Sequence, residues 1–356
     1  MSRQRPEKIA YLDDFRGLAM LIIVAGHSYP IAFADDPHRQ LDAFSPVLAL
    51  VTGGTAYFVF ISGFLYFHLF HGRKSLPSLL QSKAQNVLQP YLWFAVPLAF
   101  AQMVREKLSV DLAVMGEEVP RSLFAEFVLY IATGAAAVPY WFVPMIFLIF
   151  LASPAFDAFI RLGLRERLLV LAAAMVTALA IHRSSTLDPV QNMLYFTPYY
   201  LFGILCAQHR ERFIALAAHG LGLGLAAALV AAIVALQVGV LADVANVHAL
   251  PFTPVLDLMF VQKLAGIVLL CGLLHRFGRY AGGLFANVAT VSFAIFFMHP
   301  IVIYGLGVLG YSNWALTGLR PLDLATTTLA VTGICMAVVH AARAVAGPRT
   351  RYVLGA

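Results

Sequence analysis

Residues 11–31 read YLDDFRGLAMLIIVAGHSYPI, a largely apolar stretch that is long enough to cross a bilayer as one helix. Stretches of about 20 apolar residues recur as far as Val345, with short polar segments between them. With 61% hydrophobic and 12% charged residues and a mean hydropathy of +0.81, the chain has too few charges to cover a soluble globule. The sequence therefore predicts an all-α polytopic integral membrane protein that forms one domain over residues 1–356.

Windows of about 19 residues predict ten transmembrane helices. The stretch 120–134 is amphipathic and short, which indicates an interfacial or re-entrant segment instead. No internal repeat and no matched pair of broken helices is evident, which disfavours a transporter built on inverted repeats. The ten predicted helices lie near residues 11–31, 46–70, 84–104, 138–155, 167–182, 191–209, 214–240, 255–275, 287–309 and 322–346.

Basic residues are unevenly distributed over the predicted loops. If both termini are cytoplasmic, sixteen of the 24 Lys and Arg residues lie in inner segments and six in outer ones. This bias predicts a cytoplasmic N-terminal tail at 1–10 and a cytoplasmic C-terminal tail at 347–356. The basic leader, the apolar run and Ala32-Phe33-Ala34 could also form a cleaved signal peptide, but Asp13, Asp14 and Arg16 interrupt the start of the apolar run. No basic patch lies beside stacking aromatics, so the bilayer and not nucleic acid is the expected surrounding.

Three ionisable side chains share one stripe of the first predicted helix. At about 100° per residue, the eleven positions from Arg16 to His27 make nearly three turns, and Asp13 lies on the same face. Ionisable groups within a span are costly, so each is a functional hypothesis. Arg16, near the cytoplasm, suits phosphate binding, and His27, roughly 16 Å further out by helical rise, suits general base work. The alternative is an Asp13–Arg16 ion pair at the interface and a His27 that reaches the outer headgroups.

The pattern Leu12-Asp13-x-x-Arg16-Gly17-x-Ala19, followed by His27, resembles the opening signature of the acyltransferase family 3 membrane proteins. Three later blocks occur in the order that the family has them: YFVFISGF at 57–64, WFVP at 141–144 and SFAIFFMHP at 292–300. The resemblance covers most of the chain. It implies ten spans in a bacterial inner membrane, acetyl-CoA or another acyl-CoA as the cytoplasmic co-substrate, and O-acylation of an envelope or exported glycan or lipid-linked sugar.

The candidate site combines this resemblance with the residues themselves. His27 is the expected general base, while Asp13 orients Arg16 and Arg16 holds the phosphates of the donor. The family often carries paired arginines before the proline at 90, where this chain keeps only Lys83, so donor binding could be shared with basic residues of the inner loops. The remaining candidates are Arg73, Lys74, Lys83, Ser62 and His299 for the donor, and Tyr140, Trp141, Lys263 and Ser292 for the acceptor.

Structural alternatives exist for several of these residues. Ser62 and Gly63 are typical of close helix packing, Tyr140 and Trp141 of an outer aromatic belt, and His299 of an interhelical hydrogen bond. Lys263 lies deep in its predicted span, and its role stays open. The three cysteines lie in apolar runs and predict neither a disulfide nor a metal site. A transporter or flippase with His27, Lys263 and His299 along a polar pathway is the second hypothesis, and the sequence leaves homo-oligomerisation open.

Overall fold

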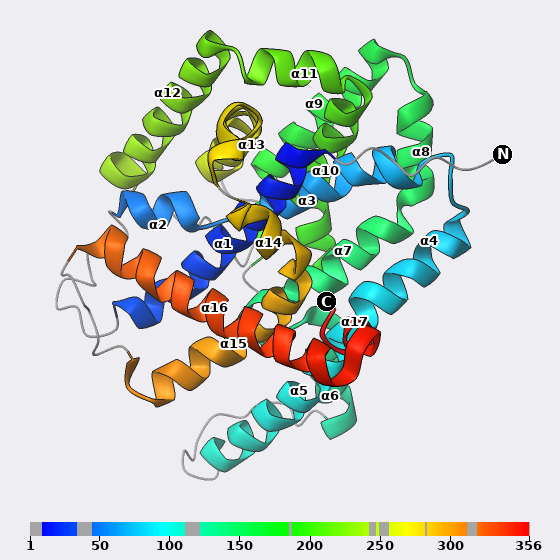
Figure 1. Cartoon of the computed structure of the whole chain (residues 1–356). Helices are drawn as coiled ribbons and strands as arrows, with labels where there is room; N and C mark the ends of the chain where they lie inside the picture. Colours follow the sequence, from blue (N-terminus) through cyan, green and yellow to red (C-terminus); the bar gives the residue numbers. More distant parts are fainter. Residues whose placement is uncertain are drawn as a thin grey trace.

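The computed structural model describes residues 9–33, 45–110, 122–184, 187–241, 247–248, 256–281, 283–311 and 319–355, which form a helical bundle (Figure 1). A short parallel pairing joins β1 (Arg183–Ser184) to β2 (Val247–His248). The α-helices are α1 (Ala10–Ala32), α2 (Pro46–Val51), α3 (Thr55–Leu65), α4 (Leu76–Lys83), α5 (Gln89–Val110), α6 (Leu123–Thr133), α7 (Phe142–Leu151), α8 (Ser153–Arg161), α9 (Leu164–Ala180), α10 (Pro189–Gln208), α11 (Arg210–Ala217), α12 (Gly220–Leu236), α13 (Leu258–Phe277), α14 (Leu284–Thr290), α15 (Ser292–Val308), α16 (Arg320–Ala346) and α17 (Thr350–Leu354). Short 3-10 and π-helical segments extend several of them, at Tyr66–Phe70, Ala84–Leu88, Val138–Trp141, Gln237–Leu241, Gly278–Ala281 and Gly347–Arg349.

Six helices among the described residues are long and apolar enough to cross a membrane, and there are eight candidate spans if each of two bent helix pairs counts as one. The predicted all-α membrane fold is thereby confirmed, but the count of ten spans is not. Helices do occupy all ten predicted positions. However, α9 has only 17 residues, and the tyrosines and amides of α10 lower the hydropathy of that helix. The six spans are Ala10–Ala32, Pro46–Phe70, Leu76–Arg105, Gly220–Leu241, Leu258–Ala281 and Pro321–Ala346.

Two helix pairs are sharply bent, which the sequence analysis did not anticipate. Leu123–Thr133 meets Val138–Leu151 at 75°, and Leu284–Thr290 meets Ser292–Val308 at 84°. The first bend follows Gly134, whose φ of 76° ends α6 in the left-handed conformation that glycine adopts without strain. The predicted interfacial or re-entrant segment at 120–134 corresponds to α6. Broken helices are also found in transporters, so the bent pairs keep the transporter hypothesis open.

The first helix runs through the middle of the bundle, where α1 packs against α3, α13, α14, α15 and α16 (Figure 1). A second close pair is α3 with α10. At Gly63 of α3, an added Cβ would lie 2.1 Å from the carbonyl oxygen of Tyr200 on α10, so any side chain there would force the helices apart. The close-packing interpretation of Gly63 is therefore confirmed. The α1 helix thus carries its polar stripe through the protein interior.

Candidate functional site

The site centres on two histidines from opposite ends of the sequence. Nδ1 of His27 on α1 lies 2.9 Å from Nε2 of His299 on α15, and the two rings stack with centroids 5.1 Å apart. On its other side, Nδ1 of His299 lies 2.9 Å from the carbonyl oxygen of Ile295. His299 is buried and His27 is partly exposed. Both histidines were predicted site residues, but the sequence did not show that they touch.

These contacts determine where the protons of the neutral pair reside. A carbonyl oxygen only accepts, so Nδ1 of His299 carries the proton and donates it to Ile295. Nε2 of His299 then has a lone pair and accepts a hydrogen bond from Nδ1–H of His27. The remaining nitrogen of His27, Nε2, is therefore unprotonated. Nε2 of His27 is the atom that can take a proton from a substrate.

The inner part of α1 holds a looser ion pair. Nη2 of Arg16 lies 3.7 Å from Oδ1 of Asp13, and the two side chains are 30% and 27% exposed. The predicted i, i+3 pair is thus present. Nε of Arg16 is buried without a hydrogen-bond partner among the described residues. Because a guanidinium has five N–H donors and Asp13 engages it only at this distance, Arg16 keeps donors for an additional anion.

The other predicted donor-binding cations lie around the end of the second span. Nζ of Lys83 lies over two aromatic rings, 4.7 Å from the centroid of Phe70 and 4.5 Å from that of Phe150. Nζ of Lys74 is 5.2 Å from the Phe70 centroid. Arg73 is exposed. The lysines therefore share one aromatic ring, and Lys74 also lines a neighbouring cavity of about 130 Å³.

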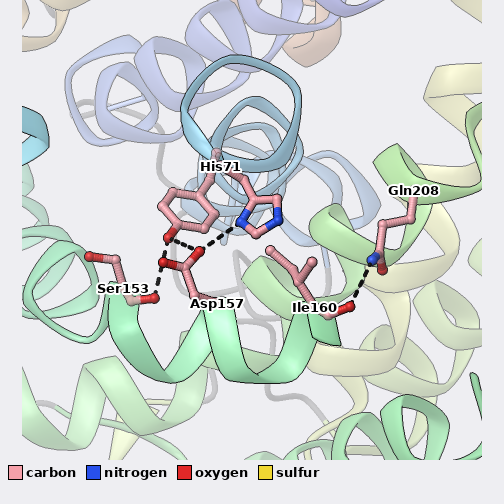
Figure 2. Close-up of polar contacts among 6 residues, drawn as sticks. His71, Ser153, Asp157, Ile160 and Gln208 are labelled. Atoms are coloured by element: carbon pink, nitrogen blue, oxygen red, sulfur yellow. Dashed lines mark hydrogen bonds and ion pairs between the residues drawn. The ribbon is translucent and has the colours of Figure 1, made fainter. Parts of the chain in front are cut away.

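A hydrogen-bonded cluster around a single carboxylate, that of Asp157, lies in this cavity and was not predicted from the sequence. Oδ1 of Asp157 on α8 is 2.8 Å from Nδ1 of His71, which follows the second span (Figure 2). The same oxygen accepts a hydrogen bond of 2.8 Å from the hydroxyl of Tyr66. Arg161 also lines the cavity. No spacing rule connects residues 86 positions apart, so only the folded chain reveals that Asp157 anchors the loop that carries Lys74.

Most of the residues predicted to bind the acceptor make their polar or ring contacts with other residues of the protein. The hydroxyl of Tyr140 is fully buried and donates to the carbonyl of Phe297 at 2.7 Å. Trp141 is 7% exposed and stacks on Phe196 at a centroid distance of 5.6 Å. Ser292 donates to the carbonyl of Ala289 at 3.0 Å, at the bend between α14 and α15. Ser62 is partly buried on α3.

The intramembrane Lys263 binds main-chain carbonyls. The helix α2 stops at Val51, which leaves its last carbonyl groups without helical partners. Nζ of Lys263, on α13, donates to the oxygens of Leu50 at 2.9 Å and Ala49 at 3.4 Å, and the side chain is 1% exposed. A cation at the C-terminus of a helix also interacts favourably with the helix dipole. The structure thus gives Lys263 a specific role in holding the break between α2 and α3.

A further cation near the histidines is Arg183 of β1. Its guanidinium carbon lies 5.4 Å from the centroid of Trp141, and its charge acts on His27 and on Lys263. Asp257, Tyr195 and Tyr199 interact electrostatically with Arg183. In the sequence, Arg183 is one of the six basic residues of the predicted outer segments and was not a predicted site residue. One feature of the sequence could have indicated a role for Arg183. It directly follows the predicted span at 167–182, on the outer side, where basic residues are few.

The described residues contain no group of three or more His, Cys, Asp or Glu side chains that could hold a metal ion. Cys206, Cys271 and Cys335 are free and buried. The site therefore offers an imidazole pair, buried cations and aromatic rings as its chemical groups.

Comparison with known proteins adds one finding. A family model described as an acyltransferase domain, that of acyltransferase family 3, matches residues 9–340. No curated protein and no solved structure matches the chain. The matched range includes α1 with Arg16 and His27 as well as α15 with His299, so the whole candidate site lies within it.

Proposed function

Because this chain belongs to acyltransferase family 3 and is a membrane acyltransferase, we propose that it transfers an acyl group from cytoplasmic acyl-CoA to a hydroxyl group of an envelope or exported glycan. The observation that carries this proposal is the chain of contacts from Ile295 through His299 to His27. Those contacts leave a basic nitrogen on His27, at the outer end of the stripe that carries Arg16 at its inner end. One helix thus offers an anion contact for the donor and a base for the acceptor.

The proposed reaction balances without a metal or a redox partner. Nε2 of His27 accepts the proton of the acceptor hydroxyl while the hydroxyl oxygen attacks the thioester carbonyl carbon. The bond from this carbon to sulfur then breaks, and the CoA thiolate takes the proton from the His27 imidazolium. The products are an O-acyl ester and free CoA thiol. His299 keeps the ring of His27 oriented throughout and stabilises the positive charge that develops on it.

Two observations support a donor on the inner side. Nε of Arg16 has no hydrogen-bond partner among the described residues, so its N–H group can bind a phosphate group. Lys74 and Arg161 line a cavity at the end of the second span. The bias of sixteen inner to six outer cations supports cytoplasmic termini. We assign the donor as acetyl-CoA or a related acyl-CoA, the acceptor as a glycan or lipid-linked sugar, and the location as a bacterial inner membrane.

A transporter or flippase is the second candidate, because the two bent helix pairs are a feature that such proteins use. The polar pathway expected for it is weakened, however, since the charge of Lys263 is bound to the carbonyls of α2. The two functions differ in chemistry. Only the acyltransferase releases a thiol.

The test uses the full-length protein in lipid nanodiscs with acetyl-CoA, and measures free thiol together with acylated sugar by mass spectrometry. Thiol release should require a hydroxylated acceptor and should match ester formation one to one. His27→Ala should lose both signals, whereas the control His340→Ala, at an exposed position of α16, should keep them. Sugar movement across the membrane without thiol release would overturn the proposal in favour of transport.

A further inference from the structure

A pocket of about 330 Å³ lies where the connection between α6 and α7 meets the segment before α10. Its polar lining comes from Arg183, Ser184 and Asn192, and its apolar lining includes Trp141 and Leu187. These five residues define what is called the Arg183 pocket below. Its volume is in the range of pockets that take small-molecule ligands, which is roughly 300 to 1,000 Å³. The proposed mechanism as stated so far leaves this space unused.

The pocket is held rigidly by hydrogen bonds between β1 and the start of α10. The amide of Asn192 accepts a bond of 3.1 Å from the backbone N–H of Ser184. The amide of Gln191 donates to the carbonyl of His182 at 2.8 Å. Arg183 itself lies in register with Val247 in the short parallel pairing of β1 with β2. The backbone on both sides of Arg183 is therefore fixed before any ligand arrives.

Arg183 is a cation in a largely desolvated place. Its guanidinium lies over Trp141, whose ring is backed by Phe196, and its Nε is buried without a hydrogen-bond partner among the described residues. Burial lowers the pKa of Arg183, while Tyr195 and Asp257 act in the opposite direction. The ordinary pKa of arginine is so high that the group stays charged at neutral pH.

The nearby carboxylate of Asp257 does not use all the hydrogen-bond donors of Arg183. Asp257 caps α13 by accepting a hydrogen bond of 2.8 Å from the backbone N–H of Phe260, so one of its oxygens already serves the helix. A guanidinium offers five donors in a planar fork and can bind two acceptors at once. Arg183 can therefore interact with Asp257 and still bind an anion in the pocket.

The pocket wall is joined to the helix that carries His299, because Tyr140, next to Trp141 in the chain, donates a hydrogen bond of 2.7 Å to the carbonyl of Phe297 on α15. The charge of Arg183 also acts on His27. Resting on the acyl transfer proposed above, we propose that the Arg183 pocket binds the acceptor and that this acceptor carries a carboxylate or a phosphate beside its reactive hydroxyl. The anionic group meets Arg183, and the polar edge formed by Ser184 and Asn192 faces the rest of the acceptor. Trp141 packs against Phe196 and contacts the guanidinium of Arg183, so we assign it the role of positioning that cation.

Three acceptors of similar size test the assignment: methyl glucoside, methyl glucuronide and glucose 6-phosphate. Wild-type protein with acetyl-CoA should have a KM for at least one of the two anionic sugars that is roughly tenfold or more below that for methyl glucoside, the factor expected of a charge-assisted hydrogen bond. The two anionic sugars separate a carboxylate acceptor from a phosphate acceptor. Equal or better use of the neutral sugar would overturn the inference.

Variants of Arg183 then locate the effect. Arg183→Gln should raise the KM for the preferred anionic sugar roughly ten- to a hundredfold and change that for methyl glucoside by less than about twofold. Arg183→Lys should recover part of the loss, because it keeps the charge without the fork. Arg105→Gln, at an exposed position of α5, is the matched control and should behave as wild type. Equal losses for neutral and anionic sugars would make Arg183 a structural residue.

A binding measurement separates this inference from the proposed reaction. In His27→Ala, which cannot transfer, the preferred anionic sugar should still raise the melting temperature more than methyl glucoside does, and Arg183→Gln in the same background should remove the difference. Anion binding without turnover in wild type would leave the pocket assignment standing and refute the reaction. Turnover of neutral sugars with no preference for anions would support the reaction and refute the pocket assignment.

Discussion

The outer and inner parts of α1 hold their polar groups in different ways. At the outer part, His27 and His299 are joined by a contact of 2.9 Å, and His299 is joined to Ile295 by a second contact of 2.9 Å. At the inner part, Arg16 and Asp13 are 3.7 Å apart and about a third exposed or less. A short, directed chain fixes the tautomer of a base. A loose, partly open ion pair leaves a cation able to bind an anion.

This difference corresponds to two tasks in one reaction. Proton transfer requires a nitrogen that is already unprotonated and correctly aimed, which is achieved by directed hydrogen bonds. Phosphate binding requires an accessible charge with free donors. Helical rise separates the two groups by roughly 16 Å along the continuous helix α1. The following substitutions test whether the outer part governs chemistry and the inner part governs donor binding.

The largest expected effect comes from His27→Ala. Transfer should fall by roughly 10² to 10⁴-fold, which is the contribution typical of a general base. Donor binding should persist, because the phosphate contacts lie elsewhere. Activity of the wild type should also decrease as pH is lowered, since a protonated imidazole cannot accept the hydroxyl proton. Steady-state rates with His340→Ala as control provide the measurement. A rate near wild type in His27→Ala would refute the assignment of His27 as the general base.

A smaller loss should follow from His299→Ala, which leaves His27 in place but frees its ring. Misorientation of a catalytic group costs roughly a hundredfold or less. The carbonyl of a glutamine can accept the Nδ1–H bond of His27, so His299→Gln should retain more kcat than His299→Ala, with an unchanged KM for the donor. If the two variants are equally impaired and both lose donor affinity, His299 contacts the donor and does not position His27.

At the inner part, Arg16→Ala should raise the KM or Kd for acyl-CoA about tenfold while the rate at saturating donor changes little. Arg16→Lys should recover part of the affinity, because it keeps the charge and loses the planar fork. Isothermal titration with CoA measures the affinity, and Arg105→Ala serves as the control. Unchanged CoA affinity in folded Arg16→Ala would reduce Arg16 to the ion-pair partner of Asp13.

The smallest kinetic effect is expected for Lys263→Met. Lys263 resembles Arg16 in being an intramembrane cation, but its donors are engaged by the carbonyls of Leu50 and Ala49. Its loss should lower the thermal stability of the purified protein by about 1 to 3 kcal/mol, the cost of buried acceptors without partners. The KM values for donor and acceptor should stay within about twofold. A selective rise in the acceptor KM at unchanged stability would restore Lys263 as a substrate contact.

Sequence reasoning was effective where the relevant order is local. The stripe of Asp13, Arg16 and His27 follows from helical periodicity alone, and α1 is one continuous helix from Ala10 to Ala32. Gly63 was correctly interpreted as a packing position. The family resemblance, too, rests on short blocks that are each contained within one predicted span.

The features that escaped prediction depend on contacts between distant segments. His27 and His299 are 272 positions apart, so their contact is a property of the packed bundle. A hydropathy window averages over the bends at 134–138 and at 290–292, so it cannot show that these helices are broken. The partners of Lys263 are main-chain carbonyls, which no residue pattern marks, and Arg183 owes its setting to Trp141, which approaches it from another connection.

The most direct test of the central claim is the tautomer of His27, measured by ¹⁵N NMR of histidine-labelled protein in nanodiscs, with His27→Ala used to assign the signal. The hydrogen-bond chain predicts that neutral His27 carries its proton on Nδ1, with an unprotonated Nε2 and a scalar coupling across the bond to Nε2 of His299. This preference should disappear in His299→Ala. A neutral His27 protonated on Nε2 in the wild type would contradict the account, because that nitrogen could not accept the proton of an acceptor hydroxyl.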